Sequence, residues 1–297
     1  MKNLLTFDIE GLVEASFDSM KVPDECVREE LECEEIEVNT YEILTILAER
    51  DQKATFFILG RIARDMPRLV RRIADAGHEI ACHGMVHRRL WQFTRDEIAA
   101  ALGEAKHRLE DVVGRPVFGF RAPDFSIGCN NLWTLDILKE LSFVYDSSIV
   151  PTALHDVYGV SGFSRTALIL PNGLVEVPMS TIRLLGQNLP YGGGGYLRLY
   201  PLWLTKALIR EMNGGRRPSV VYLHPYEMGK VIRRIPGMGV LRRIRTYTGV
   251  TTAKAKLQRL LETFEFAPMI SYVREVLSAG TPRSLATISV GRAHDVP

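Results

Sequence analysis

The sequence predicts an α/β protein with a largely parallel sheet, and three observations support this fold class. Short apolar runs alternate with amphipathic stretches along most of the 297 residues. Reactive polar side chains end several of these runs. Hydrophobic residues make up 46% of the chain and charged residues 24%, a balance that buries a sizeable core. The alternation fits either an open doubly wound sheet or a closed barrel, and its periodicity does not distinguish them.

The strands are predicted by apolar runs too short for buried helices. The first run ends in the carboxylates of TFDIE, and the third is followed at once by HGMVH. In chain order, the seven predicted strands are LLTFDI (4–9), ATFFIL (54–59), HEIAC (78–82), VFGF (117–120), FVYD (143–146), LVEVP (174–178) and SVVYL (219–223).

The helices are predicted where apolar residues recur three and four positions apart, which places them on one helix face. Thr94 and Glu97 form a capping-box pattern at the start of one such segment. The run GGGG at 192–195 predicts either a loop whose backbone approaches a ligand or an irregular connector. The predicted crossover helices span 38–50, 61–76, 94–113, 131–141 and 200–213.

The N-terminus and the cysteines predict a non-exported, cytoplasmic protein. Asp8 and Glu10 interrupt the apolar core that a signal peptide needs, and no later stretch approaches the length of a membrane span. The four cysteines lack CxxC spacing and are too few for a disulfide scaffold, so reduced thiols are expected.

Two histidines, His83 and His87, follow the third predicted strand four residues apart. On a helix or helical turn this spacing puts both on one side, with Cβ atoms roughly 5–6 Å apart, so both reach one ion. Two histidines and a carboxylate form an established zinc-hydrolase ligand set. Strand alternation turns Asp8 and Glu10 to a common face, where either could supply the carboxylate. Packing roles for the histidines and loop capping by the acids are the alternatives.

Five motifs occur in the order TFDIE, HGMVH, FRAPDFS, YDSS and YLHPYE. In this order they resemble the polysaccharide deacetylases, the NodB-homology family of carbohydrate esterases (family 4). GGGGYLRLYPLWL and the basic segment after it are similar to the subfamily found with exosortase and exopolysaccharide loci. The resemblance implies a distorted seven-stranded (β/α) barrel over residues 1–230. A basic C-terminal extension, 231–297, is expected to pack on the barrel or follow it.

The resemblance also implies hydrolytic removal of an N-acetyl group from an amino sugar, with a divalent metal bound. It assigns Asp8 as the catalytic base and Glu10, His83 and His87 as ligands of zinc, with cobalt, nickel or manganese as alternatives. Many members carry adjacent acids, TFDD. Here Ile9 takes the second position and cannot ligate, so Glu10 must reach the ion.

The other motifs carry further roles by resemblance. Arg121 matches the arginine that orients the base, and a guanidinium suits a bidentate hold on a carboxylate, although a structural ion pair is the alternative. His224 matches the general acid that protonates the departing amine, and Leu223 is expected to line the acyl pocket. Asp146 is expected to support the site or His224.

Asp124 and Phe125 are the remaining predicted substrate-binding residues. Relatives often carry tyrosine, serine or asparagine where Asp124 stands, and the resemblance assigns the backbone N–H there to the oxyanion. Its carboxylate would attract the ammonium product, alter sugar selectivity or be a solvated loop acid. His78 and His107 match no motif and are expected on the surface or in packing.

The charge pattern suggests partners, although the net charge is only +2. Residues 24–37 hold eight acids and one base, which predicts an insertion over the barrel mouth or a solvated helix face. Residues 229–259 hold nine bases and no acid, which predicts a solvated face or peripheral contact with an anionic inner membrane. A cytoplasmic deacetylase meets its sugar before export, so a nucleotide-linked or polyprenyl-linked saccharide is expected. Nucleic acid is not.

Two alternatives to the deacetylase reading stay open. A deformylase of a lipid-linked amino sugar would use the same site on a different acyl group. A non-catalytic saccharide-binding barrel would be consistent with the departures at Ile9 and Asp124.

Overall fold

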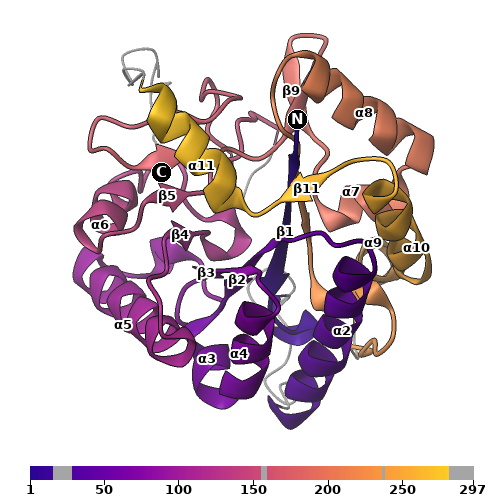
Figure 1. Cartoon of the computed structure of the whole chain (residues 1–297), viewed down its shortest axis with the longest axis horizontal. Helices are drawn as coiled ribbons and strands as arrows, with labels where there is room; N and C mark the ends of the chain where they lie inside the picture. Colours follow the sequence, from indigo (N-terminus) through magenta and orange to yellow (C-terminus); the bar gives the residue numbers. More distant parts are fainter. Residues whose placement is uncertain (16–28, 155–158, 236–237, 281–297) are drawn as a thin grey trace.

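The computed structural model describes residues 1–15, 29–154, 159–235 and 238–280, and for 29–31, 241, 242 and 245 the backbone alone. Strands and helices alternate as predicted (Figure 1). The strands are β1 (Asn3–Ile9), β2 (Thr55–Ile58), β3 (Glu79–Cys82), β4 (Gly119–Phe120), β5 (Tyr145–Asp146), β6 (Leu168–Ile169), β7 (Val175–Glu176), β8 (Thr181–Leu184), β9 (Gln187–Pro190), β10 (Val220–Leu223) and β11 (Phe266–Ala267). The α-helices are α2 (Glu29–Glu49), α3 (Gly60–Asp65), α4 (Pro67–Asp75), α5 (Arg95–Val113), α6 (Thr134–Glu140), α7 (Gly194–Leu199), α8 (Leu202–Gly214), α9 (Val240–Tyr247), α10 (Val250–Leu261) and α11 (Met269–Ala279). Short 3₁₀ turns form η2 (Leu90–Gln92), η3 (Pro123–Phe125) and η4 (Pro225–Met228).

One nine-stranded sheet runs in the order β10-β1-β2-β3-β4-β5-β7-β6, with β11 paired to β1 off this path. Its first seven members are the seven predicted strands, and all of their pairings are parallel. The sheet curls into a half-barrel. Between β7 and β10, Tyr222 N–H donates to the Gly192 carbonyl at 2.9 Å and Val220 N–H donates to Ser180 Oγ at 2.7 Å. The predicted fold class is confirmed, and this irregular seam is where the barrel is distorted.

Alternation along β1 separates an outer core from an inner one. Leu5, Phe7 and Ile9 turn outward into a cluster shared with the surrounding helices. Leu4 belongs to the inner cluster, which fills the barrel floor together with Phe57 and other inward residues. Figure 1 shows α2 to α5 arranged along the outside of β1, β2 and β3. The outward position of Ile9 leaves both flanking carboxylates facing the barrel interior.

The helices depart from prediction in two places. Pro67 begins α4 and divides the predicted 61–76 helix in two, because proline is favoured in the first helical turn and not inside a helix. Helix α2 begins at Glu29, so part of the acidic stretch 24–37 is helical, while 24–28 lie outside the described residues. Glu32 and Glu35 are 2% and 1% exposed, so a solvated face is wrong for these two acids. The Thr94–Glu97 capping box is confirmed.

The C-terminal extension contributes to the barrel. β11 pairs with Asn3 and Leu4 of β1, and α11 packs on the inner core. At the start of α11, Met269 N–H donates to Thr55 Oγ1 at 2.7 Å and Ile270 N–H donates to Glu79 Oε2 at 3.0 Å. The domain division at residue 230 stays a prediction, and residues 281–297 lie outside the described ranges. In the part of the chain that the structure describes, no helix has the length and apolar character needed to cross a bilayer.

Candidate active site

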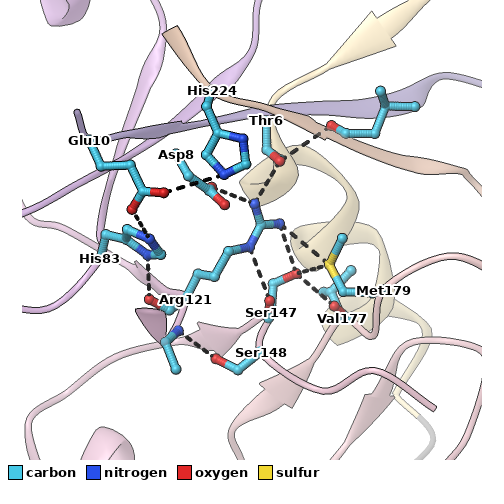
Figure 2. A network of polar contacts seen from close by, with 12 residues as sticks. Thr6, Asp8, Glu10, His83, Arg121, Ser147, Ser148, Val177, Met179 and His224 are labelled. Atoms are coloured by element: carbon cyan, nitrogen blue, oxygen red, sulfur yellow. Dashed lines mark hydrogen bonds and ion pairs between the residues drawn. The ribbon is translucent and has the colours of Figure 1, made fainter. Parts of the chain in front are cut away.

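Asp8 and Arg121 form a buried ion pair in the interior of the half-barrel (Figure 2). Arg121 Nη1 donates to Asp8 Oδ1 at 2.7 Å and to Thr6 Oγ1 at 2.8 Å, and Nε donates to the Ser147 carbonyl at 3.1 Å. The guanidinium carbon lies 4.1 Å from the centroid of the Phe57 ring, and Arg121 is fully buried. One nitrogen holds one carboxylate oxygen, so the expected bidentate geometry is not formed. Asp8 Oδ2 makes no hydrogen bond to another described residue.

The side chains of Glu10, His83 and His87 converge just beyond the end of β1. Glu10 Oε2 lies 3.1 Å from His83 Nε2 and 3.0 Å from His87 Nε2. One donor atom from each of the three side chains lies within 4.8 Å of the others, and all three residues are buried. The same-face placement of Asp8 and Glu10 expected from strand alternation is therefore present.

The HGMVH segment reaches this position as an irregular loop, whereas its spacing predicts a helical turn. His83 follows β3 directly, and its N–H donates to the Ile58 carbonyl at 2.9 Å. Gly84 has a φ of +92°, a conformation that favours glycine, and bends the chain so that His87 returns toward Glu10. The Gly60 N–H at the start of α3 donates to the Gly84 carbonyl at 2.8 Å, which fixes the loop against α3.

The hydrogen bonds of His83 prepare it to act as a ligand. Its Nδ1 lies 2.8 Å from the Arg121 carbonyl and donates to it, so the ring is oriented with Nε2 facing Glu10. Burial raises the pKa of Glu10, but the two histidines hold it well below its ordinary value. Burial likewise opposes a charge on His87, but Glu10 raises the pKa of His87 to about 9. Two imidazole nitrogens and one carboxylate are a donor set that fits zinc.

His224 completes the cluster from the end of β10. Its Nε2 lies 3.3 Å from Glu10 Oε1, and its side chain is 18% exposed, more than those of the other two histidines. Its ring stacks on Tyr226 at 5.2 Å between centroids. Burial lowers the pKa of His224, but Glu227 and Glu10 together raise it to about 9.

Glu227 was not identified as a site residue from sequence. It accepts hydrogen bonds at Oε2 from the His224 N–H at 2.9 Å and from His224 Nδ1 at 3.2 Å. Arg198 Nε donates to Glu227 Oε1 at 2.7 Å, and Glu227 is fully buried. A Cβ on Gly194 would lie 1.8 Å from Glu227 Oε2, so the glycine run lets backbone approach this carboxylate. The glutamate three residues after His224 in YLHPYE has capping-box spacing, which was the available signal.

Asp146 lies on the other side of β5 from this cluster. Its neighbour Tyr145 turns into the inner core, so Asp146 faces outward, and it is fully buried. Ser148 Oγ donates to Asp146 Oδ1 at 2.6 Å and accepts from the Ala122 N–H at 2.8 Å. Burial and the charge of Asp146 raise the pKa of Glu176 well above its ordinary value. Asp146 therefore supports the loop after Arg121 and does not contact His224.

Asp124 and Phe125 lie near the site, as predicted, whereas Leu223 lies away from it. Asp124 and Phe125 have φ values of 52° and 51°, and Arg89 Nε donates to Asp124 Oδ2 at 2.7 Å. The Asp124 carboxylate is thus ion-paired and not a solvated loop acid. Phe125 packs against Tyr222 at 4.9 Å between ring centroids and lines a small cavity. Leu223 is fully buried in the outer cluster, since Tyr222 takes the inward position on β10.

Comparison with known proteins covers most of the chain in two parts. Residues 10–145 match the polysaccharide deacetylase family, and residues 147–274 match a domain of unknown function, DUF3473. This combination is typical of the exopolysaccharide-locus subfamily.

Curated relatives match over part of their length. A chitooligosaccharide deacetylase of Sinorhizobium fredii is 40% identical over 72 residues, 24% of this chain and 34% of that protein. A peptidoglycan-N-acetylglucosamine deacetylase of Bacillus cereus is 35% identical over 134 residues, 45% of this chain and 46% of that protein. The matches thus span between a third and a half of these relatives.

Two solved structures share the fold. A protein of Mycobacterium smegmatis assigned as a polysaccharide deacetylase superposes with a TM-score of 0.66 at 23% identity, covering 95% of this chain and 92% of the other. An allantoinase superposes with a TM-score of 0.59 at 16% identity, covering 94% and 91%.

Proposed function

Because residues 10–145 form a domain of the polysaccharide deacetylase family, we propose that the protein is a metal-dependent hydrolase that removes an N-acetyl group from an amino sugar. One observation carries the proposal: the Glu10, His83 and His87 cluster lies beside the Asp8–Arg121 pair and within reach of His224. The relatives named as chitooligosaccharide and peptidoglycan deacetylases support a saccharide amide as the substrate.

Glu10, His83 and His87 would hold the metal. A divalent cation there supplies Lewis acidity, lowering the pKa of a water beside it to about 7 and polarising the amide carbonyl. The hydrogen bond from His83 Nδ1 to the Arg121 carbonyl keeps that ring oriented, as outer partners of metal-bound histidines generally do. Zinc is the first choice for these donors, with cobalt, nickel or manganese as alternatives.

Asp8 takes the proton of the attacking water in this proposal. Arg121 holds Asp8 Oδ1, which fixes the carboxylate and leaves Oδ2 as the accepting atom. Arg121 is itself fixed by Thr6, Ser147 and the Phe57 ring, so the pair is already ordered before substrate binds. Such preorganisation removes reorganisation from the chemical step.

The Asp124 N–H and His224 act on the other two reacting atoms. The Asp124 N–H makes no hydrogen bond to another described residue, and the loop is fixed by Arg89, so it is available to an oxyanion. One preorganised donor of this kind is typically worth about 3–4 kcal/mol in the transition state. His224 donates a proton to the departing nitrogen, while Glu227 keeps Nδ1 protonated and Nε2 aimed at the site.

Acetate release tests the proposal. We expect protein loaded with zinc to release acetate from N-acetylglucosamine oligomers and protein treated with a chelator to release none. Release of formate from N-formylated sugars, without acetate from N-acetylated ones, would favour the deformylase alternative. If protein with one bound zinc releases neither product, the chain is a saccharide-binding barrel and the proposed hydrolysis is wrong.

Peripheral membrane contact is a separate proposal that now rests on α9. Lys254 and Lys230 pair with Glu42, and Lys256 donates to three carbonyls at the end of α7, so these bases serve the fold. On α9, Val240 and Ile244 are 74% and 54% exposed. Bases such as the exposed Arg243 gain roughly 1 kcal/mol each near an anionic surface. Co-sedimentation with liposomes that depends on neither anionic lipid nor salt would contradict this contact.

A further inference from the structure

A second hollow, separate from the residues assigned above, lies beside the β8–β9 hairpin. Its volume is about 360 Å³, at the lower end of the range of pockets that bind small molecules. It is framed by the hairpin, by residues 151–153 after β5 and by residues 161–165. We call it the arginine groove, because Arg165 and Arg183 line it and none of the described residues that line it is acidic.

Arg165 is held in place without being neutralised. Its Nε donates to Thr181 Oγ1 at 3.2 Å and its Nη2 donates to the Thr181 carbonyl at 2.6 Å. Both acceptors are uncharged. Arg183, two residues along β8, is exposed, and no ion pair among the described residues includes either arginine. The fold therefore orders one guanidinium and presents a second beside it.

The positive charges in this region act on one another. Burial lowers the pKa of Arg165, and the charges of Arg217 and then Arg183 lower it further, against a smaller opposing effect of Glu211. Grouped guanidinium groups repel unless an anion lies between them. The grouping is therefore unfavourable in the free protein and becomes favourable when a negative ligand binds.

The walls of the groove are tied together and carry further donors. Thr152 Oγ1 donates to the Asn188 carbonyl at 2.7 Å, which joins the loop after β5 to β9. Gln187 and Asn188, whose side chains carry amides, also line the groove, and so does the buried Phe163, which is apolar. Amides and guanidinium forks around an apolar surface suit an oxyanion attached to a larger polar or apolar body.

We propose that the arginine groove binds a phosphate or pyrophosphate group. A carboxylate is satisfied by one guanidinium, whereas several arginines suit the higher charge and the several oxygens of a phosphate. Leu184 and Leu185 follow Arg183 at the hairpin turn and are 55% and 95% exposed. A prenyl chain attached to the phosphate would find exposed apolar side chains there, and a nucleoside would find Phe163.

The groove adjoins the candidate active site through two chain segments. The small cavity beside Phe125 is lined by Val150 and Pro190, and the groove is lined by Pro151 and Asn188. The two hollows are thus lined by neighbouring residues of the same two segments. Phosphate binding itself stands apart from the proposed deacetylation; only the use of the groove, to hold a sugar precursor through its diphosphate linkage, rests on the proposed function.

Calorimetric titration with inorganic pyrophosphate tests the groove independently of activity. We expect saturable binding that weakens with added salt, and at least tenfold weaker binding in Arg183→Ala. The matched control is Arg68→Ala, which removes an exposed arginine of α4, a helix that does not line the groove. This variant should bind pyrophosphate as tightly as the wild type does. Because Arg183 is exposed, its removal should leave the melting temperature unchanged.

Several outcomes would overturn the proposal. These are no saturable binding at millimolar pyrophosphate, equal binding by wild type and Arg183→Ala, or glucuronate bound as tightly as pyrophosphate. If pyrophosphate bound instead to a metal at Glu10, its affinity would not change in Arg183→Ala, which is the second of these outcomes. Tighter binding of uridine diphosphate than of pyrophosphate supports a nucleotide-linked source, and tighter binding of farnesyl diphosphate supports a lipid-linked one. If the protein releases no acetate but binds pyrophosphate through Arg183, the proposed deacetylation is wrong and the proposed phosphate site stands.

Discussion

Glu227 Oε2 lies 3.2 Å from His224 Nδ1, inside the turn that follows β10. Arg198 holds the second oxygen of this carboxylate, and burial, which raises its pKa, is outweighed by His224 and Arg198, so the pKa of Glu227 is lowered. An ionised, fully buried carboxylate at this position fixes both the tautomer and the direction of the imidazole. His224 is thus positioned from its own turn and not by Asp146.

We expect Glu227→Gln to reduce amide hydrolysis by about 10–100-fold, because a misoriented His224 loses part of the 10²–10⁴-fold that a general acid contributes. The loss should fall on kcat with KM little changed. Hydrolysis of 4-nitrophenyl acetate, whose leaving group needs no proton, should fall much less. Equal losses on both substrates would show that Glu227 is merely structural.

The Asp8–Arg121 pair leads to a prediction about the base. Asp8→Asn keeps the shape of the side chain and an oxygen for Arg121, but it cannot take a proton. We expect turnover to fall by about 10²–10⁴-fold while the bound metal stays near the wild-type ratio. Single-turnover assays with elemental analysis measure both quantities. Full activity of this variant would remove Asp8 from the mechanism.

Glu10 stands two residues after Asp8, whereas many family members carry two adjacent acids. Its Oε2 faces both imidazole nitrogens at 3.0–3.1 Å, so the longer side chain reaches the position required of a ligand. We expect Glu10→Gln to weaken zinc affinity by more than roughly the 10–100-fold that outer-shell partners typically contribute. Competition with a chromogenic chelator measures this, with Asp8→Asn as the matched control. Unchanged affinity would mean that the carboxylate is not a ligand.

The strand ends were predictable because of a general property of parallel sheets. All carboxyl ends meet at one edge, so Asp8, His83, Arg121 and His224 could be placed together without coordinates. Asp146 also ends a strand, but alternation in a two-residue strand does not reveal which face is inward, and Tyr145 takes that face. Leu223 was assigned by the resemblance alone, and its neighbour Tyr222 takes the inward face of β10.

Other features could not be predicted from the sequence, because they depend on contacts between distant segments that no local sequence pattern indicates. HGMVH spacing suits a helical turn, yet the backbone hydrogen bonds from the start of α3 and the conformation of Gly84 make it a loop. The seam between β7 and β10 is formed by single bonds to Ser180 and Gly192, which carry no strand signal. Arg198 reaches Glu227 from a helix 29 residues earlier, and only the fold brings them together.

His78, which matches no motif, is a packing residue with a consequence for stability. It is 3% exposed, and its Nδ1 accepts the Ala54 N–H at 3.3 Å, which requires the neutral ring. Burial, followed by the charge of Lys53, lowers its pKa to about 4 from an ordinary value of 6.5. Between these two pH values His78 is protonated in the unfolded chain and neutral in the folded protein. Stability from this group is therefore complete above pH 6.5 and falls by up to about 1.4 kcal/mol per pH unit below it.

We expect His78→Gln, whose amide oxygen can still accept the Ala54 N–H, to flatten this dependence. Urea unfolding free energies at pH 7, 6 and 5 should decline less steeply in the variant, and carboxylates that titrate in both proteins cancel in the difference. His107→Gln is the matched control, since the His107 side chain is 75% exposed and its loss should leave the slope unchanged. Parallel slopes for wild type and His78→Gln would show that the buried imidazole is not what destabilises the protein in acid.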